Sequence, residues 1–131
     1  MLLIIGCGID LVKIERIKKI IKKWGDNFTS RVFTLLEKEY CEKKKGSKYQ
    51  SYAGKFAAKE ALLKALGLGL RGANWKEIET INDELGQPII GTSGKLKNIA
   101  STRGVSKYFI TISHTKEYAI AQVILEGTLD K

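Results

Sequence analysis

The chain has few of the residues that build disulfide frameworks or zinc sites. Its 131 residues include two cysteines, Cys7 and Cys41, and a single histidine, His114. Two cysteines without metal-ligand spacing indicate a reducing compartment, the cytoplasm, and one histidine argues against a zinc site of the usual Cys/His kind. No apolar run is long enough to span a membrane. The short run Leu2–Ile9 has no basic leader and continues directly into an amphipathic segment, so we interpret it as structure rather than as a signal peptide.

Acidic residues are also scarce relative to basic ones, and the imbalance is local. The chain carries 23 Lys and Arg against 14 Asp and Glu, for a net charge of +9. Residues 11–50 hold 12 of the bases and 5 of the acids, which places +7 in that segment. Such a concentration indicates an anionic partner: nucleic acid, an acidic membrane surface or an acidic protein. The absence of a helix-turn-helix, an RNA-binding aromatic signature or a zinc finger argues against nucleic acid.

The residues that are present suit one globular domain over residues 1–131, with 44% hydrophobic residues. Periodicity and turn residues predict the following elements: a strand over 2–9, helices over 12–24, 34–44 and 49–66, strands over 77–81 and 87–90, a helix over 95–102, and strands over 108–113 and 118–125. Residues 28–33 are expected to connect two helices. The order β-ααα-ββ-α-ββ is typical of an α+β domain whose helices pack on one antiparallel or mixed sheet.

The first predicted helix separates apolar from basic residues. Its apolar stripe consists of Ile14, Ile17, Ile21 and Trp24, and its basic stripe consists of Lys13, Arg16, Lys19 and Lys23. A charged stripe is usually only a solvated helix face. Four cations without interspersed acids instead favour a docking surface.

Two carboxylates stand in unusual places. Asp10 ends an apolar run that suits a strand covered on both faces, so it caps the next helix, binds a ligand at the tip of the strand, or does both. Glu60 falls on the apolar stripe of its helix, where an unpaired carboxylate would be costly. It forms either an ion pair with Lys64, four residues on, or half of a metal site. Gly6-x-Gly8 lacks the third glycine of a dinucleotide fingerprint.

Cations and glycines accompany these carboxylates in the sequence. Lys55, Lys59 and Lys64 share the helix of Glu60, and His114 stands at a predicted strand end. The glycine-spaced segment 67–72 is either a helix cap with a turn or a close backbone approach to a ligand. Mg²⁺ typically binds one or two carboxylates and the phosphates of a substrate, while lysines neutralise other phosphate oxygens. The sequence therefore suggests a magnesium–phosphate site.

Four blocks of the sequence resemble the holo-[acyl-carrier-protein] synthase family of the 4′-phosphopantetheinyl transferase superfamily. They are Gly8-Ile9-Asp10, Lys55-Phe56-Ala57-Ala58-Lys59-Glu60-Ala61-x-x-Lys64-Ala65-x-Gly67, Gly86-x-Pro88, and Ile112-Ser113-His114-Thr115-x-x-Tyr118-Ala119-x-Ala121. The match runs from the first predicted strand to the last, and the predicted element order is also that of the family. The resemblance implies the 4′-phosphopantetheinyl transferase fold.

The resemblance also implies a reaction and a cofactor. Members transfer 4′-phosphopantetheine from coenzyme A to a serine of acyl carrier protein and release adenosine 3′,5′-bisphosphate. By position, Asp10 and Glu60 match the Mg²⁺ ligands, and Lys64 matches a lysine near the transferred phosphate. Lys55 falls where many members carry an arginine near the adenosine end of coenzyme A, and His114 matches a residue near its 3′-phosphate. The serine proton would pass to Glu60 or to a metal-bound water. The expected coenzyme contacts are completed by Gly67, Gly69 and Thr115.

The partners implied are an acidic carrier protein and further copies of the chain. Arg16 matches a family arginine that docks the carrier, and Phe28 and Arg31 lie in the same docking segment. Family members are homotrimers that bind the coenzyme between neighbouring subunits. The resemblance thus assigns the local positive charge to a protein partner, with no nucleic acid and no membrane.

Overall fold

The computed structural model describes residues 1–69 and 74–129. Within them, the segments with helical and strand patterns form five strands and five α-helices. The strands are β1 (Leu3–Lys13), β2 (Ile78–Asn82), β3 (Pro88–Thr92), β4 (Val105–His114) and β5 (Tyr118–Gly127). The helices are α1 (Ile14–Trp24), α2 (Asp26–Val32), α3 (Leu35–Lys43), α4 (Lys48–Ala65) and α5 (Gly94–Thr102). Short 3₁₀ turns lie at Lys45–Ser47 and Trp75–Glu77. The α+β class predicted from the sequence is confirmed.

Helix α2 is the element that the sequence prediction lacked. The segment expected to be a connection is helical over Asp26–Val32, so the order is β-αααα-ββ-α-ββ. Gly25, with φ of +53°, ends α1 and turns the chain directly into α2. A helix of 7 residues is two turns long, which is too short for a 3.6-residue period to stand out.

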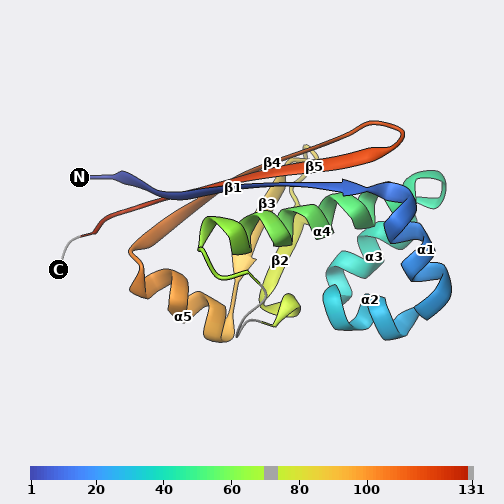
Figure 1. Cartoon of the computed structure of the whole chain (residues 1–131), viewed down its shortest axis with the longest axis horizontal. Coiled ribbons are helices and arrows are strands. Elements are labelled where there is room, and N and C mark those ends of the chain that lie inside the picture. The colour runs from blue at the N-terminus through green and yellow to red at the C-terminus, as the bar shows by residue number, and fades with distance from the viewer. Residues whose placement is uncertain (70–73, 130–131) are drawn as a thin grey trace.

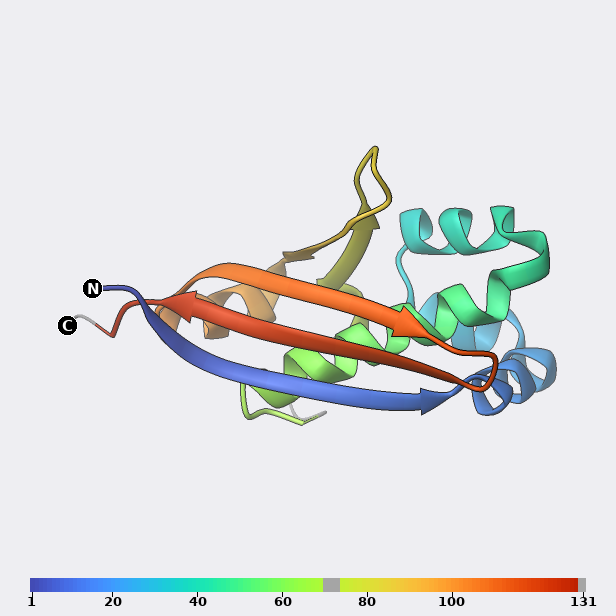
Figure 2. The ribbon, with the colours of Figure 1, turned by 90° about the horizontal axis from the view of Figure 1, so that it is seen from above.

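The strands form two antiparallel sheets rather than the single sheet expected. One sheet has the order β1-β5-β4, and the other is the β2–β3 hairpin. Helix α4 runs along one face of the three-stranded sheet, with α1 to α3 gathered at one end of it and α5 at the other (Figure 1). Seen from above, the β2–β3 hairpin projects away beside the three-stranded sheet (Figure 2). None of the described helices has the length and apolarity to cross a membrane.

Strand β1 is covered on one face, not on both as predicted. Its inner face packs closely on α4, because a Cβ at Gly6 or Gly8 would overlap the carbonyl oxygen of Ala65 or Ala61. Its outer face is open, with Ile9 54% and Leu11 60% exposed. Three apolar residues of β4 and β5 are exposed on the same outer face: Phe109, Tyr118 and Ile120.

The end of α4 is fixed by backbone hydrogen bonds around Gly67. The N–H of Leu68 donates to the carbonyl of Leu63 at 2.9 Å, and the N–H of Gly67 donates to that of Lys64 at 3.0 Å. This pair of bonds is the Schellman motif, which needs a residue with positive φ at the position of Gly67, where φ is +71°. Of the two interpretations of the glycine-spaced segment, the helix cap is confirmed for its first glycine, Gly67. The remainder of the predicted loop, residues 70–72, lies outside the described residues.

A buried ion pair joins α4 to α2, α3, the 3₁₀ turn Trp75–Glu77 and β2. Lys59 Nζ lies 2.7 Å from Glu37 Oε1, and neither side chain is exposed. The same ammonium donates to the carbonyl oxygens of Val32, Trp75 and Ile78, while Glu37 accepts from the N–H of Thr80. Glu37 also forms a capping box with Thr34 at the start of α3. Lys59, expected from the sequence among the cations near a phosphate, is therefore committed to the core.

Candidate active site

Asp10 lies within β1, and its side chain meets α4. The strand continues to Lys13, and α1 begins at Ile14 without a side-chain cap, so the interpretation of Asp10 as a helix cap is wrong. Asp10 Oδ1 accepts a hydrogen bond from Lys64 Nζ at 2.9 Å, and the same ammonium donates to the carbonyl of Ile9 at 3.0 Å. The close packing at Gly6 and Gly8 brings the strand near enough to the helix for these contacts.

Glu60 completes a group of charges around this contact. Burial raises the pKa of the Glu60 carboxyl above its usual value, and the Asp10 carboxylate raises that pKa further, while Lys64 and Arg16 oppose the rise. The ion pair between Glu60 and Lys64, one of two interpretations of the sequence, is absent from the ion pairs of the described residues, in which Lys64 pairs with Asp10. The structure thus brings Asp10, Glu60 and Lys64 together, and the charge of Arg16 acts on Glu60.

The two carboxylates fit a magnesium ion better than a metal that needs a closed protein cage. The described residues contain no cluster of three or more His, Cys, Asp or Glu side chains. Mg²⁺ commonly uses one or two carboxylates and completes its shell with waters and substrate phosphate oxygens. The two carboxylates repel each other and both are partly buried, so such an ion would relieve their repulsion.

A second group of predicted residues lines a pocket of about 230 Å³ between the start of α4 and the β2–β3 hairpin, here called the hairpin pocket. Its lining includes Tyr40, Lys44, Gly54, Lys55, Ile112 and His114. Lys55 and His114, both assigned to the coenzyme from the resemblance, are brought together here. His114 ends β4 and is exposed.

The ammonium of Lys55 is already engaged within the protein. It donates to the carbonyl of Thr80 at 2.6 Å, to the Thr80 hydroxyl at 3.2 Å and to Asn82 Oδ1 at 3.2 Å. A lysine has three N–H donors, so these bonds use all of them. The aliphatic stem of Lys55 borders the hairpin pocket, while its charge holds β2 against α4 and faces the ring of Tyr40 at 4.6 Å.

The remaining predicted coenzyme contacts lie in two turns. The hydroxyl of Thr115 accepts from the N–H groups of Glu117 and Tyr118, at 3.2 and 3.0 Å, and so closes the β4–β5 turn next to His114. Gly67 and Gly69 both have positive φ and are exposed beyond the end of α4. They lie at the end of α4 that carries Lys64, whereas Thr115 adjoins the hairpin pocket.

The predicted docking residues lie on two adjoining helices. Arg16, Lys19 and Lys23 are exposed on α1, and Lys13 is exposed at the end of β1 just before it. Phe28 is half-buried on α2, where its ring packs against Phe33 and Phe56 with centroids 6.1 and 6.4 Å away. Arg31 is exposed in the last turn of α2. The apolar stripe of α1 is buried except for Trp24, which is 54% exposed, so that assignment to the core is wrong.

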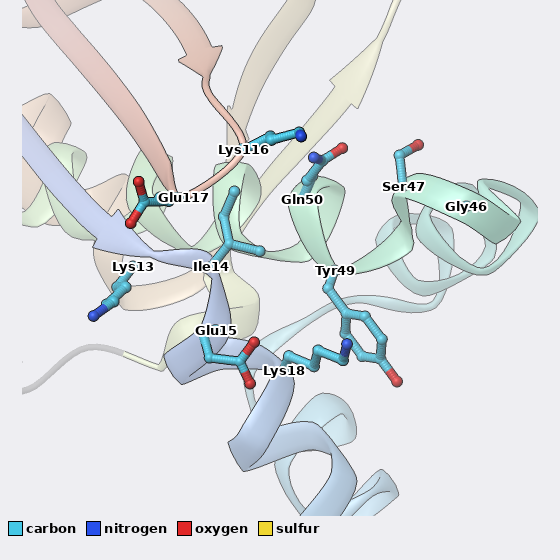
Figure 3. Close-up of a pocket in the computed structure, with 10 residues that line it drawn as sticks. All are labelled: Lys13, Ile14, Glu15, Lys18, Gly46, Ser47, Tyr49, Gln50, Lys116 and Glu117. Carbon is cyan, nitrogen blue, oxygen red and sulfur yellow. The ribbon is translucent and has the colours of Figure 1, made fainter.

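Sequence reasoning missed a groove of about 450 Å³ between the start of α1, the β4–β5 turn and the start of α4 (Figure 3). Lys18 and Tyr49 lie along one side of it, Lys116 and Glu117 project from the turn, and Gln50 lies near Lys116. The groove shares Ser47 and Gln50 with the hairpin pocket. No sequence signal could have found it, because its lining residues are spread over three distant segments.

The two predicted groups of site residues lie on opposite edges of the three-stranded sheet. Asp10 is on β1 and His114 is on β4, with β5 between them. Both residues pair in register with the inward-facing alanines of β5, Asp10 with Ala121 and His114 with Ala119. Helix α4 packs along this inner face, so within one chain it separates Asp10 from the hairpin pocket.

Comparison with known proteins identifies the family. Residues 6–123 match the family model of the 4′-phosphopantetheinyl transferase superfamily. The holo-[acyl-carrier-protein] synthase of Ruminiclostridium cellulolyticum is 44% identical over 90% of this chain and 89% of its own length. The chain belongs to the holo-[acyl-carrier-protein] synthase family. That membership confirms the enzyme class expected from the sequence.

Other relatives agree in sequence and in structure. The holo-[acyl-carrier-protein] synthase of Syntrophus aciditrophicus is 44% identical over 95% of this chain and 98% of its own length. The acyl carrier protein synthase of Plasmodium yoelii, solved with ADP bound, is 36% identical and superimposes with a TM-score of 0.85 over 98% of both chains. The Bacillus anthracis synthase, solved in complex with CoA (3′,5′-ADP), is 38% identical with a TM-score of 0.78, covering 95% of this chain and 98% of that one.

Proposed function

We propose that the chain transfers the 4′-phosphopantetheine group of coenzyme A to a serine of apo acyl carrier protein in a Mg²⁺-dependent reaction, leaving adenosine 3′,5′-bisphosphate. The observation that carries the proposal is the meeting of Asp10, Glu60 and Lys64 at the contact of β1 with α4, in a chain of this family. These residues supply two carboxylates and a cation beside them.

Each residue of this group has a proposed part in the transfer. Asp10 and Glu60 would hold Mg²⁺, which supplies a positive charge that stabilises the phosphates of the coenzyme. The Lys64 side chain is 52% exposed although its ammonium contacts Asp10, so it can reach an incoming phosphate without leaving a buried site. Glu60 is placed to accept the serine proton at its carboxylate, with metal-bound water as the alternative acceptor.

The hairpin pocket would bind the adenosine 3′-phosphate end of the coenzyme. Lys44 and His114 are both exposed and line the pocket, so they can contact a phosphate directly. The donors of Lys55 are used by Thr80 and Asn82, so Lys55 would shape the pocket and contribute its charge from beneath. Coenzyme A as substrate, together with two free cysteines, favours the cytoplasm.

The active enzyme is proposed to be a homotrimer with the coenzyme bound between chains. A coenzyme that reaches both Asp10 and His114 is easier to accommodate between two chains than within one, because α4 separates the two edges of a single chain. The outer face of the three-stranded sheet exposes Ile9, Leu11, Phe109 and Ile120, and an apolar face of this kind commonly marks a protein contact. The basic stripe of α1 and the segment with Phe28 and Arg31 would dock the acidic carrier protein.

The proposed function is tested by intact-mass measurement of carrier protein. Purified chain, apo acyl carrier protein, coenzyme A and Mg²⁺ are incubated together, with a carrier whose acceptor serine is replaced by alanine as the control. We expect one phosphopantetheine added to the carrier and none to the control. Chelation of the metal should stop the addition, and excess Mg²⁺ should restore it. No mass increase with the intact carrier would refute the proposal.

A further inference from the structure

Gly54 occupies a position where the helix itself would favour another residue. It lies in the middle of α4, is buried, and has the ordinary helical backbone of its neighbours. A glycine inside a helix costs about 1 kcal/mol relative to alanine. Other small buried residues of α4, Ala53, Ala57 and Ala58, are alanines. Something other than helix formation therefore accounts for the glycine.

The space beside Gly54 is limited by one side chain that also borders the hairpin pocket. A Cβ built at Gly54 would lie 3.0 Å from Cγ2 of Ile112, which is closer than carbon atoms normally approach. Ile112 is half-buried on β4 and, like Gly54, lines the hairpin pocket. An added methyl group would require Ile112, which lines the hairpin pocket, to shift by a few tenths of an ångström.

The other walls of the pocket give this restriction a chemical meaning. Gly54 and Ile112 form an apolar part of the lining, here called the floor, and Tyr40 adds an aromatic ring. The ammonium groups of Lys44 and Lys55 lie 5.0 and 4.6 Å from the centre of that ring. A flat aromatic base attached to a phosphorylated sugar matches this combination.

We propose that Gly54 is a specificity-determining residue. Because it carries no side chain, Ile112 can pack against α4, and the floor of the hairpin pocket leaves room for the flat base of a purine nucleotide. The inference rests on the proposed binding of coenzyme A in this pocket. Gly54 acts through Ile112, so it sets the size of the site without contacting a reacting atom.

The direct test is Gly54→Ala, with KM measured separately for coenzyme A and for carrier protein. We expect KM for coenzyme A to rise roughly ten-fold, the scale of one methylene in a tight pocket, with KM for carrier protein unchanged. The midpoint of thermal unfolding should change little, because the helical preference for alanine offsets the displacement of Ile112. A purely structural glycine would change the midpoint or the amount of active enzyme but neither KM. An unchanged KM for coenzyme A would overturn the inference.

A second variant tests the same floor without altering the helix. Ile112→Val removes one methylene from the side chain that an added methyl would displace. A coenzyme A analogue whose adenine carries an additional fused ring (1,N6-etheno-coenzyme A) serves as the larger ligand. We expect the ratio of its KM to that of coenzyme A to fall in Ile112→Val and to rise in Gly54→Ala. Equal ratios in all three proteins would refute the role of the floor.

These measurements separate the inference from the proposed function. A KM does not depend on the fraction of protein that is folded, so partial loss of folded enzyme leaves the ratios interpretable. Absence of transfer by the unaltered chain would count against the proposed function. Normal transfer by the unaltered chain, with identical KM ratios in the two variants, would count against the inference alone.

Discussion

Gly8 of β1 lies directly against the carbonyl of Ala61 in α4, with no room between them for a Cβ. A Cβ at position 8 would also come within 2.8 Å of the backbone nitrogen of Ala65. Both obstacles are backbone atoms of a buried helix and cannot rotate away. This close approach sets the distance between Asp10, two residues further along β1, and Lys64, three residues further along α4.

Gly8→Ala should therefore harm stability and activity together. Overpacking a rigid contact costs about 1–3 kcal/mol, and the strand should move away from α4 and carry Asp10 with it. Chemical denaturation and the carrier-modification rate measure the two effects. The matched control is Gly46→Ala, where a Cβ would meet no atom within 4 Å, and its stability should stay within about 0.5 kcal/mol. Equal stabilities of the two variants would contradict the prediction.

Asp10→Asn and Glu60→Gln should each slow the transfer by about 100-fold or more, because losing a metal ligand removes several kcal/mol of charge stabilisation. Both changes keep the shape of the side chain, so the midpoint of thermal unfolding should change little. Binding of Mg²⁺, followed by calorimetry in the presence of coenzyme A, should weaken in parallel. Glu39→Gln, which alters an exposed carboxylate on α3, is the control and should retain full activity. Near-normal transfer by either site variant would remove that residue from the metal site.

Lys59→Met should destabilise the fold by about 3–5 kcal/mol, because it leaves Glu37 as a buried charge without its cation. The carbonyl groups of Val32, Trp75 and Ile78 would lose a donor at the same time. Urea denaturation measures the loss. Lys97→Met, on the exposed side of α5, is the matched control and should be nearly neutral. Typical single mutations cost about 1 kcal/mol. A loss of unfolding free energy smaller than this in Lys59→Met would mean that the Lys59–Glu37 ion pair contributes little to stability.

Arg16→Ala should raise KM for carrier protein several-fold and leave KM for coenzyme A nearly unchanged. The reason is that Arg16 is exposed on the basic stripe of α1, where added salt screens its attraction to an acidic partner. The difference between variant and unaltered enzyme should accordingly shrink as ionic strength increases. Lys97→Ala on α5, at the other end of the molecule from α1 (Figure 1), is the control. Equal changes in both KM values would remove Arg16 from docking.

Local sequence signals predicted much of the fold, and they failed where tertiary packing decides. The start of α3 at Thr34 and the cap of α4 at Gly67 depend on residues close in sequence, and both lie where the sequence places them. Burial was less predictable: β1 reads as apolar throughout, yet its outer face is open in one chain. An apolar strand looks the same in sequence whether its second face meets a helix or another protein.

In the candidate site, too, the sequence predicted the residues but not their arrangement in space. The sequence singled out Asp10, Glu60 and Lys64, but not how they meet, because that depends on the glycines of β1 fitting against α4. Nor could it separate Lys59 from Lys64. Both are lysines of one helix, but the partner of Lys59 is Glu37, which a break at Gly46 and Ser47 separates from α4 in the chain.

The placement of Asp10 and His114 on opposite edges of one sheet has a genetic consequence. If the coenzyme lies between chains, an Asp10→Ala chain still offers an intact hairpin pocket, and a His114→Ala chain still offers intact carboxylates. Mixed and reassembled, the two inactive proteins should recover part of the activity, measured as modified carrier, because some interfaces would combine the two unaltered edges. A mixture as inactive as its components would indicate that each chain works alone. Alleles of this gene altered at the two edges would then be expected to complement one another, whereas two alleles altered at the same edge would not.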